Sequence, residues 1–181
     1  MKERRLVLFL DSGDTIIDEG TEQKDERGVV LAARPWPDAP DALRRLKALG
    51  FRMCMVADGF IQSFETVYRQ LDLYDLFEQR VYSEAVGREK PDAAMFETAL
   101  QKMGLEREDC SRVLMVGNNL ARDVRGANAM GIHSAFIDQS PRYPRESADL
   151  EAQPEFILHS LSELVELALE LDERLDNKYH A

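Results

Sequence analysis

Four short polar clusters in the sequence contain residue types that together could do chemistry on a phosphate group. They are Asp11-Ser12-Gly13-Asp14-Thr15, Asp58-Gly59, Arg88-Glu89-Lys90-Pro91, and Gly117-Asn118-Asn119 with Asp123. Carboxylates and neutral oxygens are the ligands that Mg²⁺ prefers in proteins. A lysine beside such ligands suits a substrate that carries phosphate. The combination therefore predicts a metal-assisted site for a phosphorylated ligand.

Each cluster taken alone has a plainer structural explanation. The segment from Asp11 to Thr15 could be a turn followed by a helix N-cap. Lys90 could be exposed at the start of a helix, residues 117–119 could form a turn, and Asp123 could be a solvated helix residue. A shared site is favoured because each cluster follows a strand or a near-strand of the predicted fold, in chain order.

Short apolar runs that alternate with helix-length amphipathic segments position these clusters. Strands are expected at 6–10, 52–57, 113–116, 134–137 and 156–158, with a weaker candidate at 81–82. Helices are expected at 39–49, 61–70, 93–103 and 121–130. This alternation predicts an α/β fold with a doubly wound, mainly parallel sheet and helices on both faces. Loops at the carboxyl ends of such strands gather in one crevice, where the four clusters would meet.

Two segments lie outside this alternation, and neither is long enough to form a second domain. Residues 18–37 carry charges around a short apolar run, with Pro35 and Pro37 behind it, which predicts a hairpin or flap over the end of the first strand. Residues 161–175 have helical spacing of apolar side chains, so we expect a C-terminal helix packed on the sheet edge. A partner-binding helix is the alternative. The prediction is one domain over residues 1–181.

Composition excludes several classes of protein. The 181 residues include 23 Lys+Arg and 34 Asp+Glu, and the resulting net charge of −11 argues against binding to nucleic acid or to anionic membranes. No apolar run approaches the roughly 20 residues that a membrane-spanning helix needs. Cys54 and Cys110 lack metal-ligand or redox spacing, as expected for buried free thiols in a reducing cytosol. These features predict a cytoplasmic protein.

The series of strands and loops resembles the haloacid dehalogenase-like (HAD) hydrolase superfamily over roughly residues 6–137. The first family motif, an apolar strand that ends in Asp-x-Asp-x-Thr, corresponds to Leu6–Thr15. The second motif falls on Met55–Gly59, the family lysine on Lys90 within 83–92, and the last acidic motif on Val116–Asp123. The last two matches extend well beyond the functional residues, so the resemblance implies the HAD core fold.

The resemblance also implies roles for individual residues. Asp11 would be the nucleophile that attacks phosphorus and forms an aspartyl-phosphate, which water then hydrolyses. Lys90 would anchor Asp11 and the transferring group, since a carboxylate that attacks a phosphate dianion needs nearby positive charge. The implied Mg²⁺ ligands are Asp11, the Gly13 carbonyl, Asn118 and Asp123. The expected substrate-binding residues are Thr15, Asp58, Gly59 and Asn119.

Three positions depart from the family motifs. Gly13 replaces the second Asp of the first motif, which in family phosphatases protonates the leaving group, and Asp14 is the candidate substitute. Ala57 replaces a Ser or Thr whose hydroxyl would bind phosphoryl oxygens. Asn118 stands where the family usually has Asp, so one ligand charge is lost and weaker Mg²⁺ binding is expected.

The absence of a cap-sized insertion narrows the functional choices. Dehalogenases and phosphonate hydrolases of the superfamily also lack the second Asp, but both use residues from a helical cap, and here only 16–37 are available. We therefore predict a capless, Mg²⁺-dependent hydrolase of phosphate esters or acyl phosphates. An open crevice suits a larger or macromolecular phosphorylated substrate, or a lid from a second subunit in a homodimer. The expected partner is a phosphorylated small molecule or macromolecule.

Two alternatives belong to other functional classes. The motif departures favour a catalytically weak or inactive relative that binds a phosphorylated ligand or a protein. The joint presence of Asp11, Thr15, Lys90 and Asp123 favours the enzyme, because a binding role gives no reason to expect all four. A phospho-accepting receiver domain is disfavoured because its phosphorylated Asp would follow a middle strand rather than the first.

Overall fold

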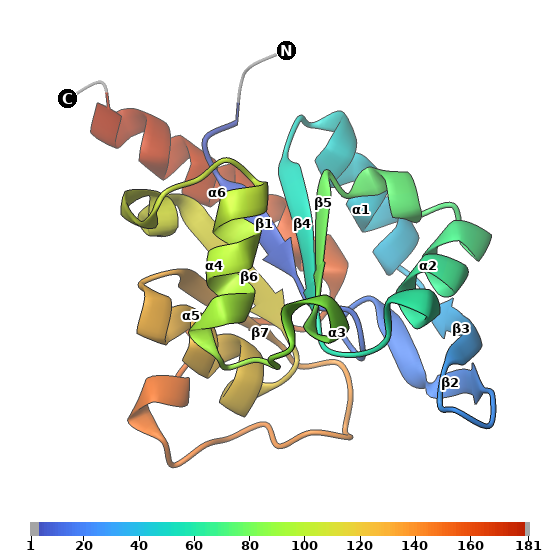
Figure 1. The fold of residues 1–181 in the computed structure, drawn as a ribbon. Helices are drawn as coiled ribbons and strands as arrows, with labels where there is room; N and C mark the ends of the chain where they lie inside the picture. The colour runs from blue at the N-terminus through green and yellow to red at the C-terminus, as the bar shows by residue number, and fades with distance from the viewer. Residues whose placement is uncertain (1–3, 180–181) are drawn as a thin grey trace.

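Runs of consecutive apolar residues form a central parallel sheet in the computed structural model, which describes residues 4–179 (Figure 1). The six strands lie in the order β5-β4-β1-β6-β7-β8, and every neighbouring pair is parallel. Their bounds are β1 Val7–Leu10, β4 Arg52–Ala57, β5 Gln79–Tyr82, β6 Val113–Gly117, β7 His133–Ile137 and β8 Phe156–Leu158. The predicted α/β fold with a doubly wound parallel sheet is confirmed.

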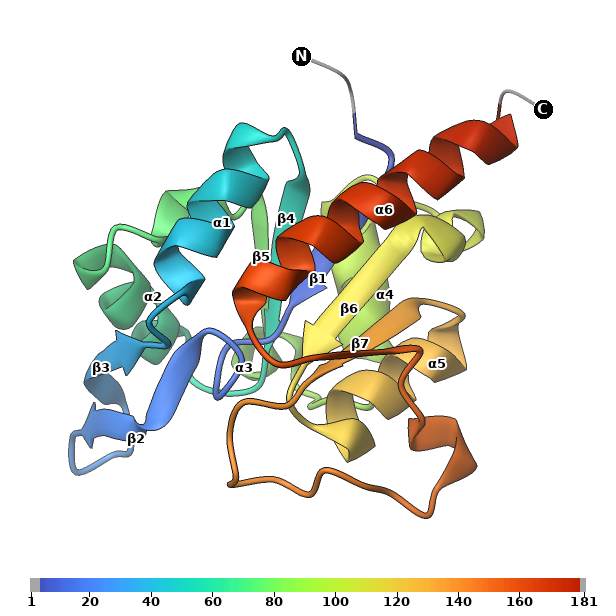
Figure 2. The ribbon, with the colours of Figure 1, turned by 180° about the vertical axis from the view of Figure 1, so that it is seen from behind.

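Alternate residues of β1 face two separate hydrophobic layers. Leu8 and Leu10 pack with the layer under α1, α2 and α6, whereas Val7 and Phe9 pack with the layer under α4 and α5. Both layers are buried because helices cover both faces of the sheet, as Figures 1 and 2 show from opposite sides. The bounds are α1 Ala39–Ala48, α2 Ile61–Gln70, α4 Ala93–Lys102, α5 Arg125–Met130 and α6 Leu161–Tyr179.

The order of the strands places a crevice beside β1. After β1 the chain forms β4 and β5 on one side, and it then crosses to form β6, β7 and β8 on the other. Open parallel sheets bind ligands where the strand order reverses, outside the carboxyl ends of the strands. The loops after β1, β4 and β6 meet at this reversal.

The predicted flap is a two-stranded antiparallel hairpin, formed by β2 (Ile17–Lys24) and β3 (Val30–Pro35). The strands are irregular, with register shifts on either side of Gln23. The Val30 amide donates a hydrogen bond of 2.9 Å to Ser63 Oγ on α2, and the hairpin lies beside that helix in Figures 1 and 2. The hairpin is thus attached to α2 and separate from the main sheet.

The C-terminal helix extends further than expected and packs differently. It ends at Tyr179, and its buried side chains join the layer under α1 rather than lying at the sheet edge (Figure 2). Asp172 is fully buried and accepts hydrogen bonds from the Arg5 and Leu6 amides, at 2.7 and 3.0 Å. Packing on a face buries more apolar surface than packing on an edge, because the helix has a long apolar stripe.

Smaller differences from the expected elements occur near the crevice. The helix expected at 121–130 begins as a π-helical turn, Leu120–Val124, and continues as α5. A short helix, α3 (Ser83–Val86), follows β5, and short 3₁₀ segments lie at Tyr74–Leu76, Arg107–Arg112 and Leu150–Ala152. No helix within residues 4–179 is both long enough and apolar enough to cross a membrane.

Candidate active site

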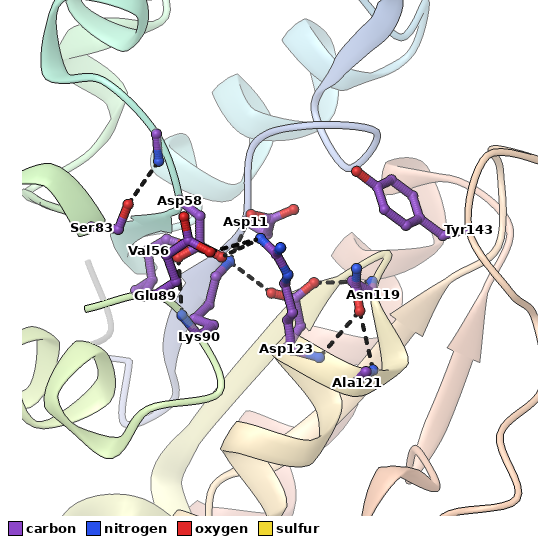
Figure 3. A network of polar contacts seen from close by, with 12 residues as sticks. Asp11, Val56, Asp58, Ser83, Glu89, Lys90, Asn119, Ala121, Asp123 and Tyr143 are labelled. Atoms are coloured by element: carbon purple, nitrogen blue, oxygen red, sulfur yellow. Dashed lines mark hydrogen bonds and ion pairs between the residues drawn. The ribbon is translucent and has the colours of Figure 1, made fainter. Parts of the chain in front are cut away.

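Asp11 lies at the carboxyl end of β1, at the base of the crevice (Figure 3). Its amide donates to the Val116 carbonyl of β6 at 2.9 Å, which continues the sheet pairing by one residue. One carboxylate oxygen accepts from Lys90 Nζ at 2.7 Å, and the other accepts from Thr15 Oγ1 at 3.1 Å. Its side chain keeps 12% exposure. The predicted nucleophile is therefore held in one orientation and remains accessible.

Lys90 is buried between three strands of the sheet. Its ammonium contacts one oxygen of Asp11 and one of Asp123, each at 2.7 Å, and donates to the Val56 carbonyl at 2.8 Å (Figure 3). Burial disfavours the ammonium, but the attraction of the carboxylates outweighs burial and raises the pKa of Lys90. Lys90 therefore stays positively charged.

Asp123 is the second buried carboxylate of the site. Its other oxygen accepts the Asn119 amide at 3.0 Å. Burial and repulsion by Asp11 raise the pKa of Asp123, and Lys90 only partly opposes them. Two carboxylates thus share a single ammonium, which leaves excess negative charge that a cation would neutralise.

Asp11, Gly13, Asn118 and Asp123 line one small pocket of about 60 Å³. Asn118 is 4% exposed, and its Nδ2 has no hydrogen-bond partner. Carboxylate, amide and carbonyl oxygens beside excess negative charge fit a hard divalent cation. Among residues 4–179 no three His, Cys, Asp or Glu side chains group as metal ligands, so the fit depends on neutral oxygens. The donor set is therefore compatible with Mg²⁺.

Thr15 and Gly59 are expected to bind substrate, but the structure gives both of them other partners. Thr15 is fully buried, and its hydroxyl is bonded to Asp11 rather than exposed in the pocket. The Gly59 amide donates to Ser83 Oγ at 2.9 Å. In this arrangement Thr15 orients the Asp11 carboxylate, and the Gly59 amide ties the loop after β4 to Ser83.

Asp58 and Asn119 do line the pocket, although their polar atoms are mostly engaged. Asp58 accepts the Lys90 amide at 3.0 Å and pairs with Arg122 at 3.4 Å. Asn119 Oδ1 accepts the amides of Ala121 and Arg122, at 3.1 and 3.2 Å, and so caps the helical turn that follows (Figure 3). Both side chains hold neighbouring site residues in place.

The structure does not bring Asp14 into the pocket. The residue has a positive φ of 51° and is fully buried, and its carboxylate accepts Ser140 Oγ at 2.8 Å and pairs with Arg142 at 3.1 Å. Burial raises the pKa of Asp14. The shift of one residue from position 13 directs this side chain to the loop after β7, so the expected replacement of the missing acid is not found there.

Glu19 of β2 is a site residue that sequence reasoning missed. A Cβ on Gly13 would overlap the Glu19 carboxylate, so this carboxylate occupies the space of a side chain at position 13. Tyr143, from the loop after β7, donates to its other oxygen at 3.2 Å, and burial together with the charge of Asp14 raises the pKa of Glu19. The sequence pointed to Glu19 only indirectly, through Gly13, which leaves room for another side chain.

Arg122 is a second missed residue, one position before Asp123. Its guanidinium lines the pocket, contacts Asp58 and Glu89 at 3.4 and 3.5 Å, and keeps 46% side-chain exposure. It supplies positive charge and N–H donors beside Asp58, the residue that follows Ala57 in the second motif. Its place within the fourth motif could have identified it.

Comparisons with known proteins agree with this geometry. A family model described as haloacid dehalogenase-like hydrolase matches residues 2–131. The chain belongs to this family. The HAD resemblance inferred from the sequence is thus confirmed, and the sheet is that of a HAD core.

The relatives of this HAD chain include proteins named as phosphatases and proteins named as dehalogenases. Glyceraldehyde 3-phosphate phosphatase of Methanopyrus kandleri is 30% identical over 139 residues, which cover 76% of this chain and 58% of the relative. (S)-2-haloacid dehalogenase of Pseudomonas sp. strain YL is 31% identical over 137 residues, covering 76% and 56%. The HAD chain thus spans less than three-fifths of these relatives.

A solved structure extends the likeness in fold beyond the family match. A Bacillus subtilis HAD-hydrolase bound to magnesium superposes with a TM-score of 0.74 and 16% identity, over 92% of this chain and 99% of that one. The likeness in fold therefore covers more of the chain than the family model, which matches residues 2–131.

Proposed function

We propose that this HAD chain is a Mg²⁺-dependent phosphatase that acts on phosphate esters or acyl phosphates through an aspartyl-phosphate on Asp11. The observation that carries the proposal is the pairing of an accessible Asp11 carboxylate with a buried Lys90 at 2.7 Å. A carboxylate in this state can attack phosphorus, provided that positive charge offsets its repulsion from the phosphate. The names of the phosphatase relatives support a phosphorylated small molecule as substrate.

Different residues have different roles in the proposed phosphoryl transfer. Lys90 offsets the charge of Asp11 through one carboxylate oxygen, and Thr15 holds the other, so that together they fix the orientation of the carboxylate. Arg122 is placed to donate to the equatorial oxygens. When bound, Mg²⁺ would be held by Asp11, the Gly13 carbonyl, Asn118 and Asp123, and it supplies Lewis-acid stabilisation of phosphoryl charge.

Within this proposal Glu19, rather than Asp14, faces the leaving group. Its carboxyl group lies where the side chain of residue 13 would lie, whereas the Asp14 carboxylate is bonded to the loop after β7. Glu19 Oε1 would give its proton to the ester oxygen as the P–O bond breaks, and water would then release phosphate from Asp11.

Hydrolysis of p-nitrophenyl phosphate and acetyl phosphate, with and without Mg²⁺, tests the proposal. Both have good leaving groups, so turnover depends little on proton donation. We expect metal-dependent turnover that Asp11→Asn abolishes and that Asp75→Asn, the same change at an exposed aspartate, leaves intact. Wild-type activity no higher than that of Asp11→Asn would instead favour a phospho-ligand-binding protein, disabled by Gly13, Ala57 and Asn118.

A further inference from the structure

A second, larger cleft adjoins the pocket of about 60 Å³ beside Asp11. It lies between the β2–β3 hairpin and α2 and has a volume of about 380 Å³. Gly13, Glu19, Asp58 and Arg122 line both spaces, so a group attached to a phosphate beside Asp11 would extend into the cleft. This size is within the range of pockets that bind small molecules.

One wall of the cleft is apolar and fixed. Phe64 of α2 stacks on Tyr82 with ring centroids 4.9 Å apart, and Val67, one helical turn away on the same wall, is buried. Phe60 lies at the start of the helix and is 44% exposed. The bond from the Val30 amide to Ser63 holds the hairpin against this wall. The cleft is therefore a bounded pocket for a compact organic group.

The other wall is charged and carries more negative than positive groups. It contains the carboxylates of Glu19, Glu22 and Asp58 against the cations Lys24 and Arg122. Lys24 is already paired with Glu22 at 2.8 Å, and Arg122 is paired with Asp58. A ligand that enters the cleft thus finds hydrogen-bond acceptors in excess and no unpaired cation on this wall.

We propose that this cleft binds the leaving group of the substrate and selects a compact neutral or cationic group, rich in hydroxyl or ammonium donors, over a second anion. This rests on the proposed function, which places the phosphate beside Asp11. Donors on the ligand would bond to the carboxylates of the hairpin, whereas a carboxylate or second phosphate would meet repulsion and lose its hydration. Polyol, aldose and amino-alcohol monophosphates fit this description, and bisphosphates do not.

Three esters that differ only at their far end test this selectivity: 2-hydroxyethyl, 2-aminoethyl and carboxymethyl phosphate. Their binding to Asp11→Asn protein is measured by calorimetry in Mg²⁺, since that variant cannot turn them over. We expect the neutral and cationic esters to bind about tenfold more tightly than the anionic one, from one unit charge at a half-exposed wall. Equal or tighter binding of carboxymethyl phosphate would overturn the proposal.

A charge reversal on the hairpin locates the effect. Glu22→Lys should move the preference toward carboxymethyl phosphate by about tenfold or more, because the wall then carries a net positive charge. Glu26→Lys makes the same change on the exposed turn of the same hairpin, outside the cleft, and should leave the preference nearly unchanged. An equal shift in both variants would show that overall charge, not the cleft, discriminates.

The two proposals can fail separately. Turnover of p-nitrophenyl phosphate by the wild-type protein, lost in Asp11→Asn, reports on the phosphatase. The order of the three esters is read from binding to the inactive variant. If p-nitrophenyl phosphate is turned over but the three esters do not bind in the expected order, only the assignment of the cleft is wrong. If the esters bind in the expected order without turnover, the cleft assignment is supported and the phosphatase is rejected.

Discussion

The two walls of the crevice differ in how they hold their charges. On the wall made by the strand ends, the side chains of Lys90 and Asp123 are 1% and 2% exposed. On the hairpin wall, the paired side chains of Lys24 and Glu22 keep 53% and 17% exposure. Charges interact strongly when buried and are screened in water. The strand wall therefore tolerates little substitution, whereas residues of the hairpin wall can change, and with them the substrate, without loss of the fold.

The largest effect is expected on the strand wall, from Lys90→Met. The change leaves Asp11 and Asp123 buried beside each other without a cation, which costs about 3–5 kcal/mol of unfolding free energy. Turnover should also fall by at least about 10³. Urea unfolding followed by circular dichroism measures the first effect. Lys47→Met, on the exposed face of α1, is the matched control and should unfold like the wild type.

Adding a carboxylate at position 13, and then removing the one at position 19, tests whether Glu19 takes the place of the side chain that Gly13 lacks. Gly13→Asp alone should reduce turnover of alkyl phosphates by about 10², because the new side chain overlaps Glu19. The double variant Gly13→Asp with Glu19→Ala should recover most of that loss. The steady-state turnover rates of the two variants are compared. A double variant that is no faster than Gly13→Asp alone would show that Glu19 does not donate the proton.

A smaller and more selective effect is expected from Glu19→Gln. The amide keeps the size of the side chain and can still accept from Tyr143, but it has no proton to give. Turnover of an alkyl phosphate should fall by about 10², and turnover of acetyl phosphate should change by only a few-fold. A uniform loss on both substrates would indicate that Glu19 supports the site rather than the leaving group.

The smallest effect is expected at the mouth of the cleft. Phe60→Ala removes a half-exposed ring that contributes apolar contact but holds no other residue in place. KM for an alkyl phosphate should rise about two- to fivefold with little change in kcat, and acetyl phosphate should be unaffected. Phe156→Ala removes the same ring from β8 on the far side of the sheet and serves as the control.

The strand wall was predictable because its residues follow strands that the sequence reveals. Leu6–Leu10 is an unbroken apolar run, so Asp11 had to lie at a strand end, and Lys90 was identified by its motif. The sheet order then brings Asp11, Lys90 and Asp123 together with no further information. The hairpin expected at 18–37 matches β2–β3, and the helix expected at 161–175 matches the start of α6, although α6 is longer and packs on a face of the sheet.

The hairpin wall was not predictable because long-range contacts build it. Asp14 is turned from the pocket by Ser140 and Arg142, which lie 126 and 128 residues away in the chain. Glu19 lies in the part of β2 where the register shifts, between Asp18 and Gln23, and Tyr143 donates to its carboxylate. No pattern in residues 12–24 encodes these contacts. The present partners of Thr15 and Gly59 were not predictable for a related reason, since the fold pairs them with Asp11 and Ser83.

The Arg5 and Leu6 amides, just before β1, donate hydrogen bonds to Asp172 and so connect the first strand to the last helix. During synthesis β1 leaves the ribosome early, yet the partner for these amides is translated 166 residues after Leu6. Until then β1 lacks the packing that α6 provides on one face of the sheet. A chain that stops short of α6 would therefore leave these amides without their carboxylate partner and this apolar layer exposed to water.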